Sequence, residues 1–142
     1  MKYVYLLTLF FLFVQCSNIK SVSDASLLNR DDKTIKYILK ENSAEEVNKN
    51  ILYFTSGFYN ENIEVKVGSD IVYSEKTNTI DQLSLAHIQV VQNENPISIK
   101  FNVFNISLNH NNLIKYKFIY ISKFMNKGKY LIEYSNKSRI FR

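Results

Sequence analysis

The chain has 142 residues, with 18 Lys or Arg against 13 Asp or Glu and a formal net charge of +5. It contains one cysteine, which excludes an intramolecular disulfide and a cysteine-based zinc site. Gly and Pro are scarce and Tyr and Phe number ten each. The abundance of aromatic and β-branched residues favours strands.

The first residues are typical of an export signal. Residues 3–14 form a continuous apolar run, long enough for the hydrophobic region of a secretory signal and too short to span a bilayer. The run ends at Gln15 and Cys16, after which the chain becomes polar. We therefore expect residues 1–16 to be a signal peptide that is processed next to Cys16, and the protein to act outside the cytoplasm.

The sequence leading into the cysteine, Leu12-Phe13-Val14-Gln15-Cys16, resembles the lipobox of bacterial lipoproteins. In that family the cysteine becomes the first mature residue and carries lipid. Gln15 stands where a small residue is usual. The resemblance implies a membrane anchor at Cys16, in the cell envelope, at the outer membrane or the cell surface. The alternative is an ordinary signal peptide and a freely secreted protein.

After the signal, residues 17–30 are polar and rich in Ser, which predicts a flexible linker. Residues 31–142 are enough for one hydrophobic core, and we expect them to form a single domain.

The segment 31–41 has an ambiguous pattern. Ile35, Ile38 and Leu39 suit a short amphipathic helix capped by Asp31, whereas Ile35, Tyr37 and Leu39 also alternate as in a strand. Both alternatives stay open. The sequence from Ser43 to Glu46 fits a capping box and predicts a turn of helix near residues 43–49.

From Ile51 onward, apolar and polar residues alternate in short runs separated by turn-forming residues. These runs are Ile51 to Phe58, Ile63 to Val67, Ile71 to Tyr73, Ala86 to Val90, Ile97 to Val103, Ile106 to Leu108, Leu113 to Ser122 and Tyr130 to Tyr134. Gly68-Ser69-Asp70 supplies turn chemistry for a hairpin. The pattern predicts an all-β fold, an antiparallel β-sandwich of about seven or eight strands.

The signal and the strand spacing together are similar to those of small secreted lipoproteins of Bacteroidetes-type bacteria. In these proteins a β-sandwich follows the lipid-bearing cysteine, and most have no assigned function. The resemblance therefore implies a fold and an anchor but no activity.

The common catalytic motifs are missing from the sequence, which has no phosphate-binding glycine loop, nucleophile elbow, dinucleotide fingerprint or His-Glu-x-x-His. The two histidines are His87, within a predicted strand, and His110, within a predicted turn. We interpret both as surface residues. The sequence indicates a protein that is not an enzyme, with no cofactor and no metal site.

Charge is distributed unevenly along the chain. Residues 113–142 hold eight Lys or Arg and one acidic residue, whereas residues 17–112 hold nine basic and twelve acidic residues. In the alternating pattern the aromatic side chains point inward and the lysines outward, which argues against base stacking. We predict no nucleic-acid binding, and we name a candidate surface for an anionic partner: Lys115, Lys117, Lys127 and Lys129.

Export, fold class and the missing catalytic groups favour a non-catalytic lipoprotein of the envelope that binds a protein or glycan or helps to assemble a complex. The alternative is a secreted enzyme or inhibitor that acts on an extracellular polymer or toxin, such as an immunity-type protein.

Overall fold

The computed structural model describes residues 18–102, 104–124 and 128–141. The predicted signal peptide, including Cys16, lies outside the described residues, as does Lys127.

The described residues form nine strands and two helices. In chain order they are β1 (Ile19–Ser23), α1 (Lys33–Glu41), β2 (Lys49–Phe54), β3 (Glu61–Val67), β4 (Asp70–Thr77), β5 (His87–Gln92), β6 (Ile97–Phe101), β7 (Phe104–Ser107), α2 (His110–Lys115), β8 (Phe118–Phe124) and β9 (Lys129–Ser135).

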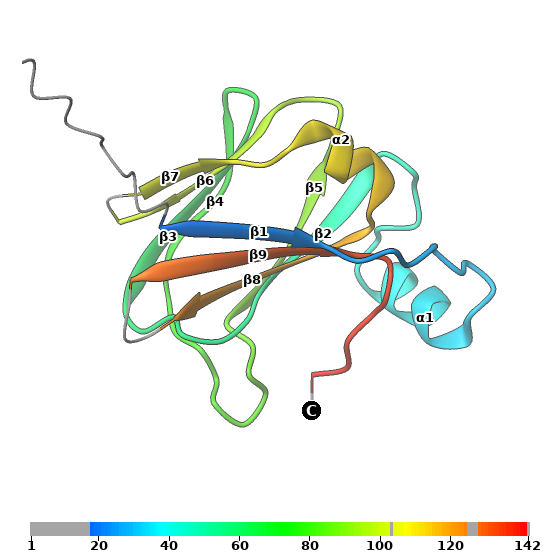
Figure 1. The fold of residues 1–142 in the computed structure, drawn as a ribbon, viewed down its shortest axis with the longest axis horizontal. Coiled ribbons are helices and arrows are strands. Elements are labelled where there is room, and N and C mark those ends of the chain that lie inside the picture. The colour runs from blue at the N-terminus through cyan, green and yellow to red at the C-terminus, as the bar shows by residue number, and fades with distance from the viewer. Residues whose placement is uncertain (1–17, 103, 125–127, 142) are drawn as a thin grey trace, which may run out of the picture.

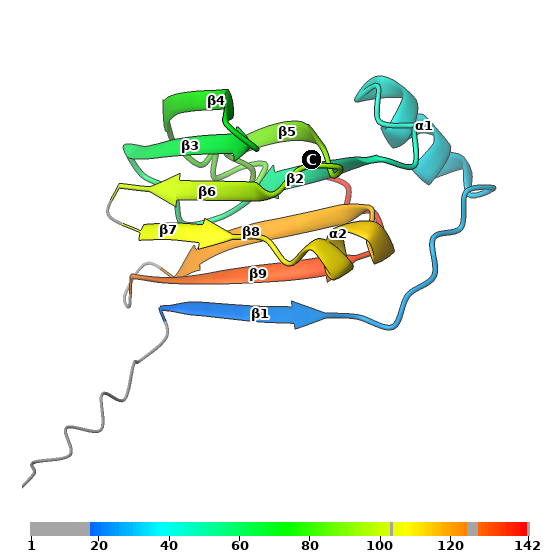
Figure 2. The same cartoon turned by 90° about the horizontal axis from the view of Figure 1, so that it is seen from above.

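The strands form two layers, which confirms the predicted sandwich. Sheet A has the strand order β1-β9-β8-β2-β5, and sheet B has the order β4-β3-β6-β7. Both helices lie toward one end of the sandwich, and β1 and β9 begin at the other end (Figures 1 and 2). The strand count is slightly above the predicted seven or eight because β1 was assigned to the linker.

The sheets are not purely antiparallel, which corrects one part of the prediction. β1 pairs with β9 in parallel, and β2 pairs with β8 in parallel. Both pairs join strands that are far apart along the chain, so no short hairpin fixes their direction. Local alternation and turn residues carry no information about such pairings.

The β3–β4 hairpin is confirmed. The two strands are antiparallel, and Gly68 in the turn has φ of +62°, a conformation that glycine adopts without strain. The main core lies between the two sheets. It is built from alternating side chains of both, including Phe54, Val65, Ile99 and Ile121, each fully buried.

Sheet A is also covered on its outer face. Ile51, Tyr53, Phe118 and Tyr120 pack there against helix α1. Consecutive residues of β2 and of the first part of β8, Phe118 to Ile121, are therefore buried on alternate sides, and these stretches have no solvated face. The prediction that Phe118 and Tyr120 point into the sandwich was wrong, because they point to its outside and lie beneath the helix.

Of the two alternatives for the segment 31–41, the helix is correct: Lys33–Glu41 form α1, but the predicted cap Asp31 was wrong. Its N-cap is Asp32, whose side chain accepts hydrogen bonds from Thr34 N at 2.8 Å and Ile35 N at 3.1 Å. Ile35 and Leu39, four residues apart, are its buried residues. The second predicted turn of helix, near residues 43–49, is not formed. Ser43 has φ of +51°, which is incompatible with the extended backbone of an N-cap.

The predicted flexible linker, residues 17–30, is wrong over most of its described length. Ile19–Ser23 forms β1, and Asp24 N continues the pairing to Tyr134 O at 3.1 Å. The Asn136 side chain then donates to Ser26 O at 3.0 Å. An edge strand tolerates polar residues because one side of it faces solvent, so its composition resembles a linker. The folded domain therefore begins at Ile19, before the predicted boundary at residue 31.

The predicted long strand from Leu113 to Ser122 is also wrong at its start. Residues His110–Lys115 form α2, and the strand begins only at Phe118. The cap is Asn109, whose side chain accepts from Asn112 N at 3.2 Å. The Asn-rich cluster that suggested a turn is thus the beginning of a helix.

Candidate functional site

The structure does not bring the four predicted lysines together. Lys115 is exposed at the end of α2, whereas Lys129 begins β9 at the opposite end of the sandwich. Lys127 lies outside the described residues. Lys117 is buried, with 4% of its surface exposed. The anionic-partner surface remains a prediction for Lys115 and Lys129, and Lys117 does not belong to it.

Lys117 instead has a structural position. Its ammonium donates to Glu46 O at 2.6 Å and to Lys49 O at 2.5 Å, the carbonyls that lead into β2. Burial, together with the nearby charges of Arg30 and Lys49, lowers the pKa of Lys117 to about 8. The sequence pattern misplaced this residue because it lies in the link between α2 and β8, where strand alternation does not apply.

The two histidines lie on different elements. His87 begins β5 and its ring stacks on Tyr73 with centroids 3.8 Å apart, while His110 begins α2. In the part of the chain that the structure describes, no three His, Cys, Asp or Glu side chains are grouped so that they could hold a metal ion.

A buried charged cluster, which sequence reasoning missed, joins the two sheets. Glu61 is 1% exposed and accepts from Lys123 Nζ at 2.5 Å and from the hydroxyl of Tyr130. The pKa of Tyr130 is raised by burial and by this bond to the carboxylate. Phe101 stacks on the Tyr130 ring with centroids 4.3 Å apart. The buried carboxylate is thus paired, and the cluster connects β3 with β8 and β9.

The outer face of sheet B carries a polar hollow of about 420 Å³. Its lining residues are Asn62, Ile63, Glu64, Ser74, Glu75, Lys76, Lys100 and Asn102. Acidic and basic groups are mixed there, which is typical of a solvated sheet face.

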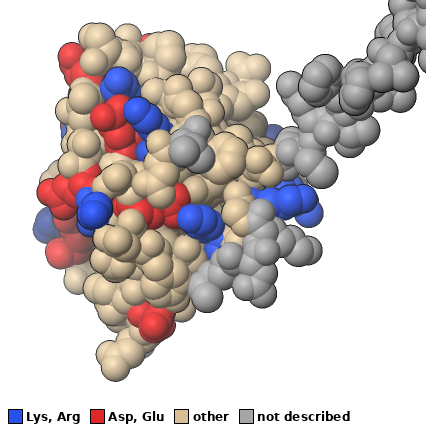
Figure 3. Space-filling view, turned by 90° about the vertical axis from the view of Figure 1, so that its left-hand side faces the viewer, with Lys and Arg blue, Asp and Glu red and all other residues tan. Residues whose placement is uncertain are grey.

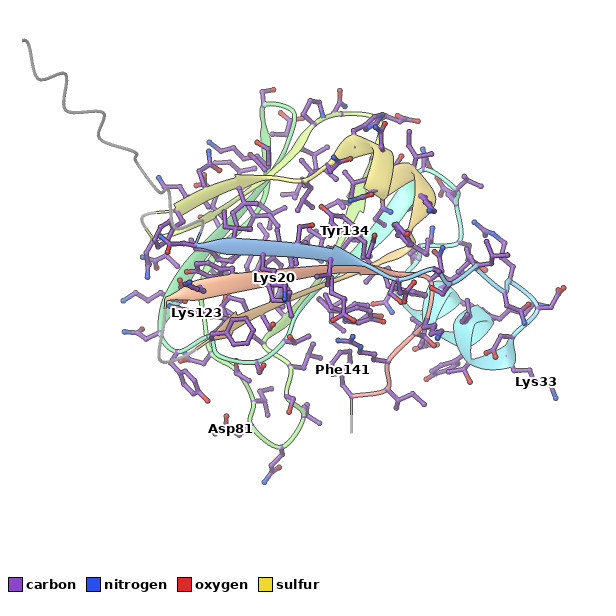
Figure 4. All side chains as sticks on the ribbon, viewed as in Figure 1. Lys20, Lys33, Asp81, Lys123, Tyr134 and Phe141 are labelled. Carbon is purple, nitrogen blue, oxygen red and sulfur yellow. The ribbon has the colours of Figure 1, made fainter. Side chains whose placement is uncertain are left out.

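The strongest candidate site is a groove of about 640 Å³ on the outer face of sheet A, beside α1. It is lined by Lys33, Thr34, Tyr37, Ile38, Glu41, Asn42, Tyr53, Leu85, Ile88, Arg139, Ile140 and Phe141. Figure 4 shows Phe141 between the loop that carries Asp81 and the helix that carries Lys33. We call this feature the α1 groove.

One wall of the α1 groove is the C-terminal segment, which Tyr120 holds in place. The Tyr120 hydroxyl donates to Lys137 O at 2.8 Å and accepts from Arg139 N at 3.0 Å. The Arg139 guanidinium lies 4.1 Å from the centre of the Tyr120 ring and pairs with Glu133. These contacts hold the C-terminal segment in place as one wall of the α1 groove.

Stacked aromatic rings form the floor of the α1 groove. The Tyr53 ring lies 5.1 Å from that of Tyr120 and 5.3 Å from that of Phe141, measured between centroids. Burial raises the pKa of Tyr53 to about 12, so its hydroxyl stays neutral at ordinary pH.

The remaining lining combines aliphatic residues with polar and charged ones, and it is accessible to a partner. Ile140 is 58% exposed and Tyr37 is 65% exposed, while Ile38, Leu85 and Ile88 are partly buried. Among the lining residues Glu41 is the one carboxylate, and there is no His or Cys. The arrangement offers an apolar binding surface with a charged rim.

Sequence reasoning missed the α1 groove because its walls come from α1, β2, β5, the loop before β5 and the C-terminal segment. The alternation in residues 31–41 contained the relevant signal, since Tyr37 and Ile38 are apolar positions beyond the buried pair of the helix. No pattern in the sequence indicated the path of the backbone at residues 136–141.

No protein-family model, curated protein or solved structure matches this chain. None of the described helices is both long enough and apolar enough to span a membrane.

Proposed function

We propose that the protein is a non-catalytic binding module of the cell envelope, tethered through a lipid on Cys16, and that it binds a protein partner in the α1 groove. The signal segment and the lipobox-like sequence support the location. The α1 groove is the single observation that supports binding. A protein that is exported but not anchored is the alternative location.

The chemistry of the α1 groove favours a protein partner over a glycan. A sugar ring stacks on the exposed face of an aromatic side chain. The Tyr53 ring is only 3% exposed and is already stacked on its neighbours, which leaves Tyr37 as the exposed aromatic side chain of the lining. The accessible walls are aliphatic, with Ile140 the most exposed of them. Such walls bind the apolar side chains of a protein segment.

The size of the α1 groove is consistent with this function. Its volume of about 640 Å³ has room for several apolar side chains. Each Leu, Ile or Phe side chain that is fully buried contributes roughly 1.5–3 kcal/mol. Lys33, Glu41 and Arg139 at the rim would orient the partner through charge.

The proposal is tested by placing a photo-crosslinking amino acid at Ile140, in the α1 groove, and at Ile71, on β4. The two positions are matched in exposure, at 58% and 56%. Cells that make the full-length protein are irradiated, and the crosslinked products are identified. We expect the same protein to be captured from Ile140 and from a second groove position, Tyr37, and not from Ile71.

Two results would overturn binding in the α1 groove. One is equal capture of the same protein from Ile71, since that site lies on the other sheet. The other is unchanged capture after Ile88→Asp, in a variant shown to be folded, because a carboxylate on the floor would expel an apolar side chain.

A further inference from the structure

The first strand begins very close to the proposed lipid anchor. Asn18 O already accepts a hydrogen bond from Tyr130 N at 2.7 Å, so pairing with β9 starts there. The parallel register then runs from Ile19 beside Tyr130 to Ser23 beside Tyr134. Five paired positions therefore hold the start of β1 firmly on sheet A.

Chain length limits how far Cys16 can lie from this strand. Cys16 precedes Asn18 by two residues, and a fully extended residue spans at most about 3.6 Å, which gives roughly 7 Å in total. A lipid on Cys16 therefore cannot act as a long tether. It must draw the end of the sandwich where β1 begins to the surface of the membrane.

The side chains at this end suit a membrane surface. Phe124, the last residue of β8, is 47% exposed, although it is a large apolar residue. Lys20 is exposed on β1, where it pairs with Leu131, and Lys129 begins β9 two residues before Leu131. We call Lys20, Phe124 and Lys129 the membrane-facing end. An aromatic residue flanked by lysines is the usual composition of an interfacial contact.

The acidic residue that β3 places beside β8 and β9 does not oppose this contact. Glu61 is buried and paired with Lys123, so it presents no charge to the outside. Glu64 and Glu75 lie on β3 and β4, the half of sheet B remote from β1. Figure 3 looks at this end of the molecule. Acidic and basic side chains are mixed over its left and centre, and basic ones occur without acidic ones toward its right-hand side.

We propose that the membrane-facing end lies on anionic lipid headgroups, with the Phe124 ring in the interfacial region and the lysines near phosphate groups. This inference rests on the proposed lipidation of Cys16. It fixes the orientation of the molecule. Helix α1, with Lys33, lies at the end away from Lys123 in Figure 4, so the α1 groove is left accessible to a partner.

The absence of tryptophan from the chain provides a direct test. Phe124→Trp places a single fluorophore in the membrane-facing end. Ile114→Trp is the control, because Ile114 is 64% exposed on α2 at the opposite end. Each lipidated full-length variant is reconstituted into vesicles of phosphatidylglycerol and phosphatidylcholine with brominated acyl chains. We expect the fluorophore at 124 to be blue-shifted and quenched several-fold more strongly than that at 114.

A pair of charge reversals tests the role of the lysines. Lys20→Glu with Lys129→Glu should reduce quenching at 124 several-fold on these vesicles. The matched reversals Lys36→Glu with Lys40→Glu, both exposed on α1 at the other end, should leave it unchanged. Equal quenching at 114 and 124 in protein whose mass shows the lipid would overturn the orientation and leave the anchor standing. Absence of lipid in that mass would overturn both.

Discussion

Lys117 shows how burial changes the chemistry of a single side chain. Its ammonium donates hydrogen bonds to two backbone carbonyls. Burial, together with the nearby charges of Arg30 and Lys49, lowers its pKa to about 8. In the unfolded chain the same group keeps its proton up to about pH 10.5. Between these values the unfolded state binds more protons than the folded state.

The stability of the protein should therefore rise between pH 8 and pH 10. Relative to Lys117→Met, which lacks the titrating group, the free energy of unfolding should increase by about 2 kcal/mol over this range. Urea denaturation of both proteins at several pH values measures the difference. A constant difference would show that Lys117 keeps an ordinary pKa in the fold.

The pH range of this comparison must end at about pH 10. Above that pH, the ionisation of tyrosines lowers the free energy of unfolding. The pKa of Tyr53 is raised from its ordinary value of 10 to about 12. Its unfolded form loses the proton first, so above pH 10 the stability falls with rising pH. Comparison with the variant cancels this contribution, which both proteins share.

At the scale of elements, the link between β2 and β3 depends on Gly57. Its φ is +90°, and a Cβ atom built there would lie 1.9 Å from Lys123 O. Lys123 N donates to Ser56 O at 2.9 Å, so the two backbones are held at this distance. A side chain at residue 57 would push β8 away from the link.

Gly57→Ala should destabilise the protein by more than about 2 kcal/mol, because it adds a backbone clash to an unfavourable φ. Gly128→Ala is the matched control. Gly128 has φ of +56°, and a Cβ atom there would meet nothing within 4 Å. This control should cost about 1 kcal/mol. Thermal or urea denaturation gives both values, and equal losses would contradict the close approach.

The elements also show which features could be predicted from the sequence. The β3–β4 hairpin was predicted because alternation and turn chemistry agree along one short stretch. Residues 109–117 were misread because Asn serves equally as a turn residue and as a helix cap. β1 was missed because only Ile19 and Val22 of its five residues are partly buried, too few to give a period.

At the scale of the whole molecule, the predicted sandwich is correct, but the order of its strands could not be predicted from the sequence. The order β1-β9-β8-β2-β5 joins the first and last strands, which are separated by the entire domain. The α1 groove depends on the same long-range arrangement, together with the C-terminal segment held by Tyr120. Local patterns predict strands, whereas pairing between distant strands depends on how the complete core packs.

The same arrangement connects the two proposals. The membrane-facing end lies where β1 and β9 begin, and the helices lie at the other end (Figure 1). A molecule held in this way would present the α1 groove away from the lipid. Both proposals therefore depend on the state of Cys16.

The central claim is tested most directly by the intact mass and detergent partitioning of the protein made with its own signal, compared with Cys16→Ser. We predict that the mature chain begins at Cys16, carries the mass of an acylated glyceryl group and enters the detergent phase, whereas the variant stays in the aqueous phase. A mature chain that begins after Cys16, or one with an unmodified Cys16 in the aqueous phase, would contradict the anchored binding module.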